Sequence, residues 1–418
     1  MFAICRLVAW CLILLVAPGP AAAQTIPRPY PGDRLAYISG GKLYVGFPQA
    51  HLVPGPGNAF QPAFSYDGQW LAFLRQVSSG GSQLWVARAD GSRPRYMAPF
   101  VASFAWSPAA DVIAARASTN TASPNVILMT PIGKPRPAPG GLGGSFAWSP
   151  DGHTLAVAGT ALRYPSRLSL IRGNSVQSVR LPYREPHSPV LLPGWWPGNR
   201  GILYWTDPTG CHSCIADGTH LFDYDLTAGT VRSVGFTLPY RDWVAPHGNQ
   251  LLTVQGGARS AFFGKHLQLC VAGGRCRWLP GSAAPQISDD PAWSPVSEEL
   301  AFVVAPAWNT EGWDNRAHFR RWLNAHVLWT GGPMASGSLA WEPSRSVPAG
   351  VSAPQWTRDG RGLLFVRNGA LWLDVHYGAS NPRRLAQLIP PNTFPDQSFA
   401  YQLWYYGHMN WHDLFAWY

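Results

Sequence analysis

The chain has 418 residues and a net charge of +10 at neutral pH, from 32 lysines and arginines against 22 acids. The positive charge resides almost entirely in arginine, since only Lys42, Lys134 and Lys265 are lysines. Arginine is suited to carboxylates, phosphates and aromatic faces. Most of these arginines are scattered along the sequence, whereas nucleic-acid binding needs a clustered stripe of charge. Nucleic acid is therefore not the expected partner.

The first 23 residues have the pattern of a secretory signal peptide. Arg6 precedes an apolar run from Leu7 to Ala17, and Ala21, Ala22 and Ala23 supply a small-residue cleavage site. The run is too short for a membrane span, which takes about 20 residues, and no later segment is apolar enough to form one. We expect cleavage near Ala23 and an exported mature protein, either periplasmic or extracellular.

A strand-turn-strand motif recurs along the rest of the chain. It reads AFSYDGQWLAF from Ala63, FAWSPDGHTLAV from Phe146 and QWTRDGRGLLFV from Gln355. In the turn, Pro fixes φ, Asp binds nearby backbone and Gly accepts a positive φ, so Asp67, Asp151 and Asp359 are predicted to cap turns. The preceding Trp or Phe is predicted to pack between neighbouring units. The second strands open at Leu71, Ile113, Leu155, Ile202, Leu251, Leu300 and Leu363, with intervals of 42 to 63 residues.

These units predict the architecture. Each contains a third strand, such as Gln83–Ala87, and a weaker fourth one, and four strands in about 45 residues make one propeller blade. The mature start carries a second strand at Leu35 without a first one, and the chain finishes with Phe415–Trp417. Pairing of these two segments would close the ring. We therefore predict an all-β fold: one propeller over residues 24–418 with eight four-stranded blades, seven being the alternative.

The letters F-x-W-S-P-D-G-x-x-L-A-F, followed by a strand and the turn Ala89-Asp90-Gly91, resemble the Pro-Asp variant of the WD repeat found in TolB-like propellers. The resemblance spans nearly the whole mature chain. It implies the fold and leaves the function open. The related prolyl-oligopeptidase-type enzymes need an attached hydrolase domain with a G-x-S-x-G elbow, and the sequence contains no such elbow.

Four cysteines follow the signal segment. The short spacings favour two local disulfides, Cys211 with Cys214 and Cys270 with Cys276, in an oxidising compartment. A zinc site formed by these thiols with His212 or His220 is the alternative.

The longest insertions fall in loops that propeller topology sends to one face, and four consecutive blades supply them. They are 207–218, 255–265, 305–324 and 389–412. Arg316, Phe319, Arg320 and Trp322 have the spacing of one short helix. The candidate binding residues in these loops, which we call the crown residues, are aromatic or cationic, the usual composition of a binding hot spot: Arg259, Phe262, Trp308, Trp313, Arg316, Phe319, Arg320, Arg321, Trp322, Trp404, Tyr405, Tyr406, His408 and Trp411.

Two classes of function remain. In the first, a monomeric, non-enzymatic propeller binds an envelope protein, a peptide or a cell-wall polysaccharide through the crown residues. In the second, a single-ring enzyme of the lactonase, lyase or glycosidase kind acts at the channel mouth, where acids or histidines from different blades would converge. The sequence favours the first class, and it indicates no catalytic residue, no metal site and no cofactor.

Overall fold

A computed structural model describes residues 34–418 with gaps at 56, 79, 119–123, 143–144, 160–166, 182–189, 207–218, 238–243, 247–248, 256–265, 272–275, 283–284, 308–315, 334–338, 376–380 and 391–410. The predicted signal peptide lies outside these residues. Within them no helix has the length and hydrophobicity that a bilayer crossing requires.

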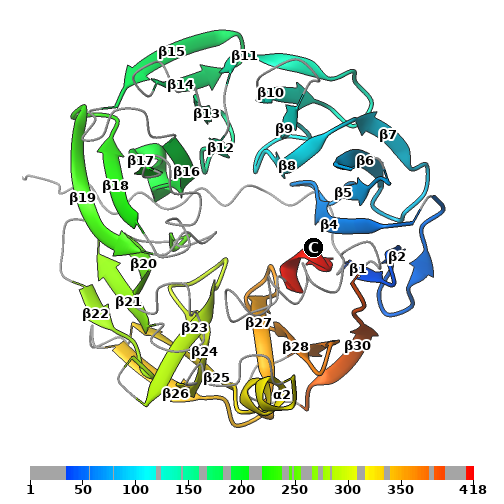
Figure 1. Cartoon of the computed structure of the whole chain (residues 1–418), viewed down its shortest axis with the longest axis vertical. Coiled ribbons are helices and arrows are strands. Elements are labelled where there is room, and N and C mark those ends of the chain that lie inside the picture. Colours follow the sequence, from blue (N-terminus) through cyan, green and yellow to red (C-terminus); the bar gives the residue numbers. More distant parts are fainter. Residues whose placement is uncertain are drawn as a thin grey trace, which may run out of the picture.

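The strands form eight antiparallel sheets arranged as a ring (Figure 1). Blade 1 contains β31 (Phe415–Trp417), β1 (Leu35–Ser39), β2 (Lys42–Val45) and β3 (His51–Leu52). Blade 2 contains β4 (Ala59–Phe64), β5 (Trp70–Gln76), β6 (Ser82–Arg88) and β7 (Arg95–Ala98). Blade 3 contains β8 (Val101–Trp106), β9 (Ile113–Ser118), β10 (Pro124–Met129) and β11 (Arg136–Leu142). Blade 4 contains β12 (Ser145–Trp148), β13 (Leu155–Ala158), β14 (Arg167–Arg172) and β15 (Ser175–Arg180).

The second half of the ring follows the same order, from the innermost strand outward. Blade 5 contains β16 (Val190–Trp195), β17 (Gly201–Thr206), β18 (Thr219–Asp225) and β19 (Thr230–Thr237). Blade 6 contains β20 (Gln250–Gln255), β21 (His266–Val271) and β22 (Cys276–Trp278), and its innermost position is marked by a single bridge between Val244 and Leu251. Blade 7 contains β23 (Gln286–Trp293), β24 (Leu300–Pro306), β25 (Val327–Pro333) and β26 (Leu339–Pro343). Blade 8 contains β27 (Val351–Trp356), β28 (Leu363–Arg367), β29 (Ala370–Asp374) and β30 (Arg383–Gln387).

Helices are short in the described residues: α2 (Arg316–Asn324), η1 (Pro197–Asn199) and η2 (Trp411–Asp413). The eight-bladed all-β propeller predicted from the sequence is thereby confirmed, as is its one short crown helix.

The predicted ring closure is also confirmed. β31 pairs with β1, with Leu35 opposite Trp417 and Tyr37 opposite Phe415, and the C-terminus lies by blade 1 in Figure 1. Side chains from the neighbouring blades clamp this seam. The guanidinium of Arg358 in blade 8 lies 4.2 Å from the centre of the Tyr418 ring, and its Nη2 donates to the Tyr66 carbonyl in blade 2 at 2.9 Å. The seam therefore joins three blades rather than two strands alone.

The core lies between and within the blades. The residues that open the second strands are all buried, with at most 2% of their surface exposed: Leu35, Leu71, Ile113, Leu155, Ile202, Leu251, Leu300 and Leu363. Because both faces of each sheet pack against a neighbouring blade, the second strands are continuous apolar runs rather than alternating ones. Leu300–Val304, for example, is buried throughout.

The motif tryptophan connects consecutive blades, as predicted. The indole Nε1 of Trp106 donates to the Ala63 carbonyl at 3.0 Å, and Trp148 donates to Ala105 at 3.3 Å. The same bond recurs from Trp195 to Ala147 at 3.1 Å and from Trp356 to Ala292 at 3.1 Å. In each case the acceptor is on the innermost strand of the preceding blade, so the repeated tryptophan links each of these blades to the one before it.

The Asp-Gly turns between first and second strands have the predicted chemistry. Asp67 Oδ1 accepts hydrogen bonds from the Ser65 hydroxyl at 2.6 Å and from the Gln69 backbone at 2.9 Å, and Asp151 and Asp359 do the same in their own turns. Gly68 has a φ of +68°, and a Cβ there would meet the Tyr418 ring. The turn therefore requires glycine for both its backbone conformation and its contact with the preceding blade.

The predicted disulfide between Cys270 and Cys276 is present, and it joins two facing positions of β21 and β22. This bond removes two of the four thiols from the alternative zinc site. Cys211 and Cys214 lie outside the described residues.

Candidate functional site

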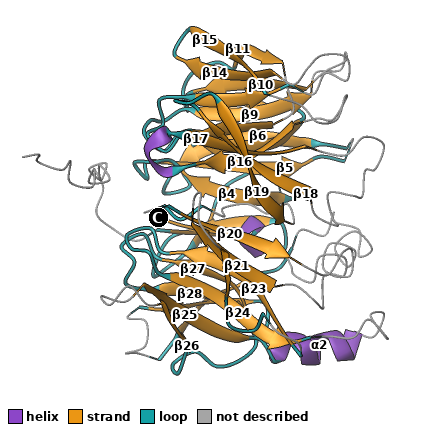
Figure 2. Cartoon of the chain, turned by 90° about the vertical axis from the view of Figure 1, so that its left-hand side faces the viewer, coloured by secondary structure: helices purple, strands orange, loops and turns teal. Residues whose placement is uncertain are grey.

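The candidate site is the ring face opposite the Pro-Asp-Gly turns. Loops between first and second strands are short, as in 65–69 and 149–154, whereas the segments leaving the other face are long in blades 5 to 8: 207–218, 256–265, 307–326 and 388–414. In Figure 2, α2 projects from one side of the ring and the C-terminus lies toward the other. We call the side of α2 the loop face and the opposite side the turn face.

Helix α2 places two adjacent cations on the loop face. Arg320 and Arg321 are exposed on it. The helix ends at Asn324, and the Ala325 and His326 amides donate to the Trp322 and Leu323 carbonyls, which leads the chain directly into β25. Two adjacent arginines are thus held on a rigid element whose end is fixed to blade 7.

Trp322 has a different role from the one predicted. Only 6% of its surface is exposed, it packs against Ile287 and Ala305, and its Nε1 donates to the Pro306 carbonyl at 2.8 Å. A buried indole cannot offer a face to a ligand, so its assignment as a binding residue is wrong. Trp322 anchors the helix that presents the arginines.

The other crown residues are placed only in part. Trp411 is half-buried and packs against the core cluster at the ring closure. Arg316 and Phe319 belong to α2, but their side chains are outside the described set. The remaining predicted binding residues also lie outside the described residues: Arg259, Phe262, Trp308, Trp313, Trp404, Tyr405, Tyr406 and His408. Their role remains a prediction.

A buried histidine that the sequence did not single out lies under α2. The His326 ring makes an edge contact with Trp322, with 4.3 Å between the ring centres, and lies close to the Val351 backbone and the Asp289 carboxylate. Burial lowers its pKa from 6.5 to about 4, and the Asp289 carboxylate opposes this shift. His326 is therefore uncharged at neutral pH and forms part of the helix anchor.

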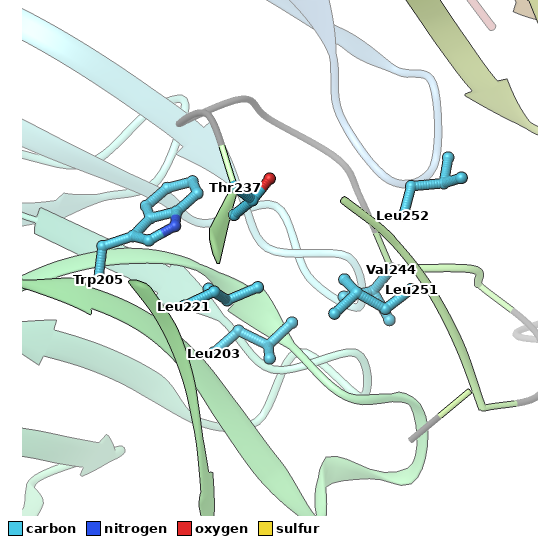
Figure 3. A pocket seen from close by; sticks show the side chains of 7 residues that line it. All are labelled: Leu203, Trp205, Leu221, Thr237, Val244, Leu251 and Leu252. Atoms are coloured by element: carbon cyan, nitrogen blue, oxygen red, sulfur yellow. The ribbon is translucent and has the colours of Figure 1, made fainter. Parts of the chain in front are cut away.

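Two of the cavities in the described part of the chain lie between blades, away from the predicted site. One, of about 10 Å³, lies between blades 5 and 6 and is lined by Leu203, Trp205, Leu221, Thr237, Val244, Leu251 and Leu252 (Figure 3). It is almost entirely apolar and has about the volume needed for one water molecule. The other, of about 110 Å³, lies between blades 1 and 2, with Lys42, Leu52, Phe73 and Trp85 in its lining.

The described residues contain no group of three His, Cys, Asp or Glu side chains that could hold a metal ion. A carboxyl pair exists on the turn face, where Asp111 of blade 3 lies beside Asp67 of blade 2. Burial raises the pKa of Asp111 to about 6, and the negative charge of Asp67 adds to the rise. This pair lies in the interface between two blades, so its effect is on the packing of the ring.

The molecule is a single-ring β-propeller with one extended loop face. No family model matches the sequence, and no curated protein matches it. Among solved structures, it is similar to a eukaryotic initiation factor, at 13% identity and a TM-score of 0.50 over 83% of each chain. It is also similar to TolB from Acinetobacter baumannii, at 15% identity and a TM-score of 0.38 over 77% of this chain and 80% of that one.

A further similar structure is an oligogalacturonate lyase in complex with manganese, at 11% identity and a TM-score of 0.46 over 84% of this chain and 82% of that one. At these identities the similarity concerns the fold alone, and propellers host many unrelated activities. The function has to be argued from the residues of this chain.

Proposed function

We propose that this protein is an exported binding module of the cell envelope, and that its partner, an envelope protein, a peptide or a wall polysaccharide, docks on the loop face. The observation that carries the proposal is the asymmetry of the ring. Long segments leave one face of four adjacent blades, while the turn face keeps short Pro-Asp-Gly turns. Closing and packing the ring requires no such difference between the faces.

Helix α2 supports the proposal in chemical terms. Arg320 and Arg321 are exposed on α2, and the buried Trp322 anchors the C-terminal end of this helix. An arginine fork binds carboxylates and phosphates through two parallel hydrogen bonds, and a rigid support reduces the entropy lost on binding. The Cys270–Cys276 disulfide supports export, because such bonds persist in oxidising compartments.

A site-specific photo-crosslinker tests the proposal directly. One variant carries it at Arg320 on the loop face, and the matched control carries it at Arg361, an exposed arginine of a turn on the turn face. We expect crosslinks to one discrete envelope component from position 320 and none from position 361. Equal labelling from both positions, or from position 361 alone, would contradict the proposed docking face.

A further inference from the structure

The outermost strands of the blades are rich in arginine and poor in acids, although these strands are far apart in the sequence. The eight strands β3, β7, β11, β15, β19, β22, β26 and β30 contain seven arginines, no lysine and one acid, Glu342. They supply six of the chain's ten net positive charges from about a tenth of its residues. We call these side chains the rim arginines: Arg95, Arg136, Arg180, Arg232, Arg277, Arg383 and Arg384.

All seven rim arginines are exposed, and they occur in six of the eight blades. Because the outermost strands form the circumference of the ring in Figure 1, the arginines follow its outer edge. Arginines from strands that are far apart in the sequence are therefore brought to one edge of the ring.

Protection of the strand edges does not explain this pattern. Charged residues on an edge strand prevent pairing with another chain, but lysine and glutamate serve that purpose as well as arginine does. The bias toward one sign goes beyond this requirement. Arg180 even lies directly opposite Arg167 on β14, and two like charges in register destabilise a strand pair. Arg232, opposite Asp223, is the one rim arginine with an acid as its register partner.

Exposed rings and apolar side chains accompany these arginines. Tyr96 follows Arg95 on β7 and is 46% exposed, and Trp278 follows Arg277 on β22 and is 52% exposed. Phe236 on β19 is 42% exposed. Aromatic rings offer flat apolar faces, and arginine forks bind carboxylates or sulfates. Together they fit a chain of sugar rings that carries acidic groups.

We propose that the rim arginines form a binding surface for an acidic polysaccharide. A flexible polyanion can follow the circumference and reach several blades, whereas a flat membrane would touch only the few blades on one side. The Cys270–Cys276 disulfide beside Arg277 indicates an oxidising compartment, where polysaccharides rather than nucleic acids are the abundant polyanions. This surface is separate from the loop face and does not depend on its function.

Binding to alginate, a polyuronate, tests the proposal, with neutral dextran and a single-stranded oligonucleotide of matched charge as comparisons. We expect the full protein to bind alginate with an affinity that falls steeply with added salt and to ignore dextran. Replacing Arg95, Arg136, Arg180 and Arg277 with Gln should weaken alginate binding at least tenfold and make the salt dependence shallower. The matched control replaces Lys134, Arg172, Arg200 and Arg361, which are exposed, off the outer strands and outside the proposed docking face, and should bind like the wild type.

Arg→Lys changes at the same four rim positions keep the charge on the edges, so this variant remains soluble if edge protection matters. We expect it to bind alginate several-fold more weakly than wild type, because lysine lacks the fork. If the rim and control variants lose alginate affinity equally, the loss reflects net charge alone, and the proposal is overturned. Tighter binding of the oligonucleotide than of alginate would also overturn it, as would a Gln variant that only aggregates while the Lys variant binds alginate as wild type does.

Discussion

Leu35 and Trp417 are register partners in one antiparallel strand pair, although nearly the whole described chain lies between them. Phe415, Trp417 and Tyr418 are all buried, so the last strand supplies apolar contacts to blade 1 as well as backbone hydrogen bonds. Each large side chain removed from such a site loses roughly 1.5–3 kcal/mol of burial. The closure is therefore a major contribution to the stability of the whole ring.

Deletion of residues 413–418 should lower the melting temperature by about 10 °C or more and do so in a single transition, because an open ring exposes a strand edge and a blade face. Thermal unfolding followed by circular dichroism measures this. A truncated protein that melts at the wild-type temperature would show that the closure does not support the ring.

The bond between motif tryptophans and the preceding blade can be isolated with one substitution. Trp148→Phe keeps most of the aromatic packing of this side chain but removes the N–H that donates to the Ala105 carbonyl. It should lower the free energy of unfolding by about 1 kcal/mol. Urea denaturation measures the change.

The chain offers a matched control for this experiment. Trp417 occupies the same motif position in blade 1, but its Nε1 is buried without a hydrogen-bond partner among the described residues. Trp417→Phe should therefore cost less than Trp148→Phe. If the two changes destabilise the protein equally, the motif tryptophan contributes to stability through the packing of its aromatic side chain and not through the hydrogen bond.

The fold could be predicted because the repeated residues determine where each strand begins and how each turn is stabilised. Each motif leucine or isoleucine begins a strand buried on both faces, and each turn aspartate satisfies its own backbone amides, so strand positions and blade number can be read locally. The irregular backbone positions could not be predicted from the sequence. Innermost strands β4, β23 and β27 bulge near Gln61, Asp290 and Ala353, which have positive φ despite carrying side chains. Their partners are far away in sequence: the Ala353 amide donates to Asp290 Oδ2, and Gln61 Nε2 donates to Asp413 Oδ1.

The candidate site was predictable only in outline. Loop lengths and strand order identify the loop face, but helical spacing alone cannot tell which side of α2 faces the blade, and Trp322 lies on the buried side. The rim arginines could not be predicted, because the repeat motif covers only the first two strands of each blade. The outermost strand has no such motif, and Arg95 and Arg180, for example, occupy different positions within their strands.

The carboxyl pair on the turn face predicts a pH-dependent stability. Burial and the nearby Asp67 raise the pKa of Asp111 from 3.8 to about 6. The folded protein therefore binds the proton more tightly than the unfolded chain does, and stability is lost as the pH rises from about 4 through 6. At the equivalent contact between blades 4 and 5, an uncharged amide replaces one of the two carboxyl groups. There, Asn199 Nδ2 donates to Asp151 Oδ2 at 2.6 Å.

Asp111→Asn should reproduce that amide-to-carboxylate bond and raise the melting temperature at pH 7.5, with little effect at pH 4. The reciprocal change, Asn199→Asp, should create a second acid pair and lower the melting temperature at pH 7.5 more than at pH 4. Melting curves across this range compare the two variants. An Asp111→Asn effect that is the same at both pH values would mean that the pair does not titrate between them.

The anchor of α2 predicts the opposite pH response. Burial lowers the pKa of His326 from 6.5 to about 4, so the unfolded chain binds this proton more readily than the folded protein does. The stability that the neutral ring contributes is present above pH 6.5 and is lost as the pH falls toward 4. Protonation places a charge under Trp322, where Asp289 compensates for its burial only in part.

His326→Gln should remove this acid sensitivity while keeping a polar side chain of similar size. Hydrogen exchange of the α2 amides at pH 7.5 and pH 5 measures it locally: we expect wild-type protection to fall at pH 5 and the protection of the variant to change much less. Amides of β9, which is distant from α2, serve as the internal reference, because global destabilisation would deprotect them as well. If α2 and β9 lose protection together in wild type and variant alike, His326 does not control the attachment of the helix, and the acid response belongs to the ring as a whole.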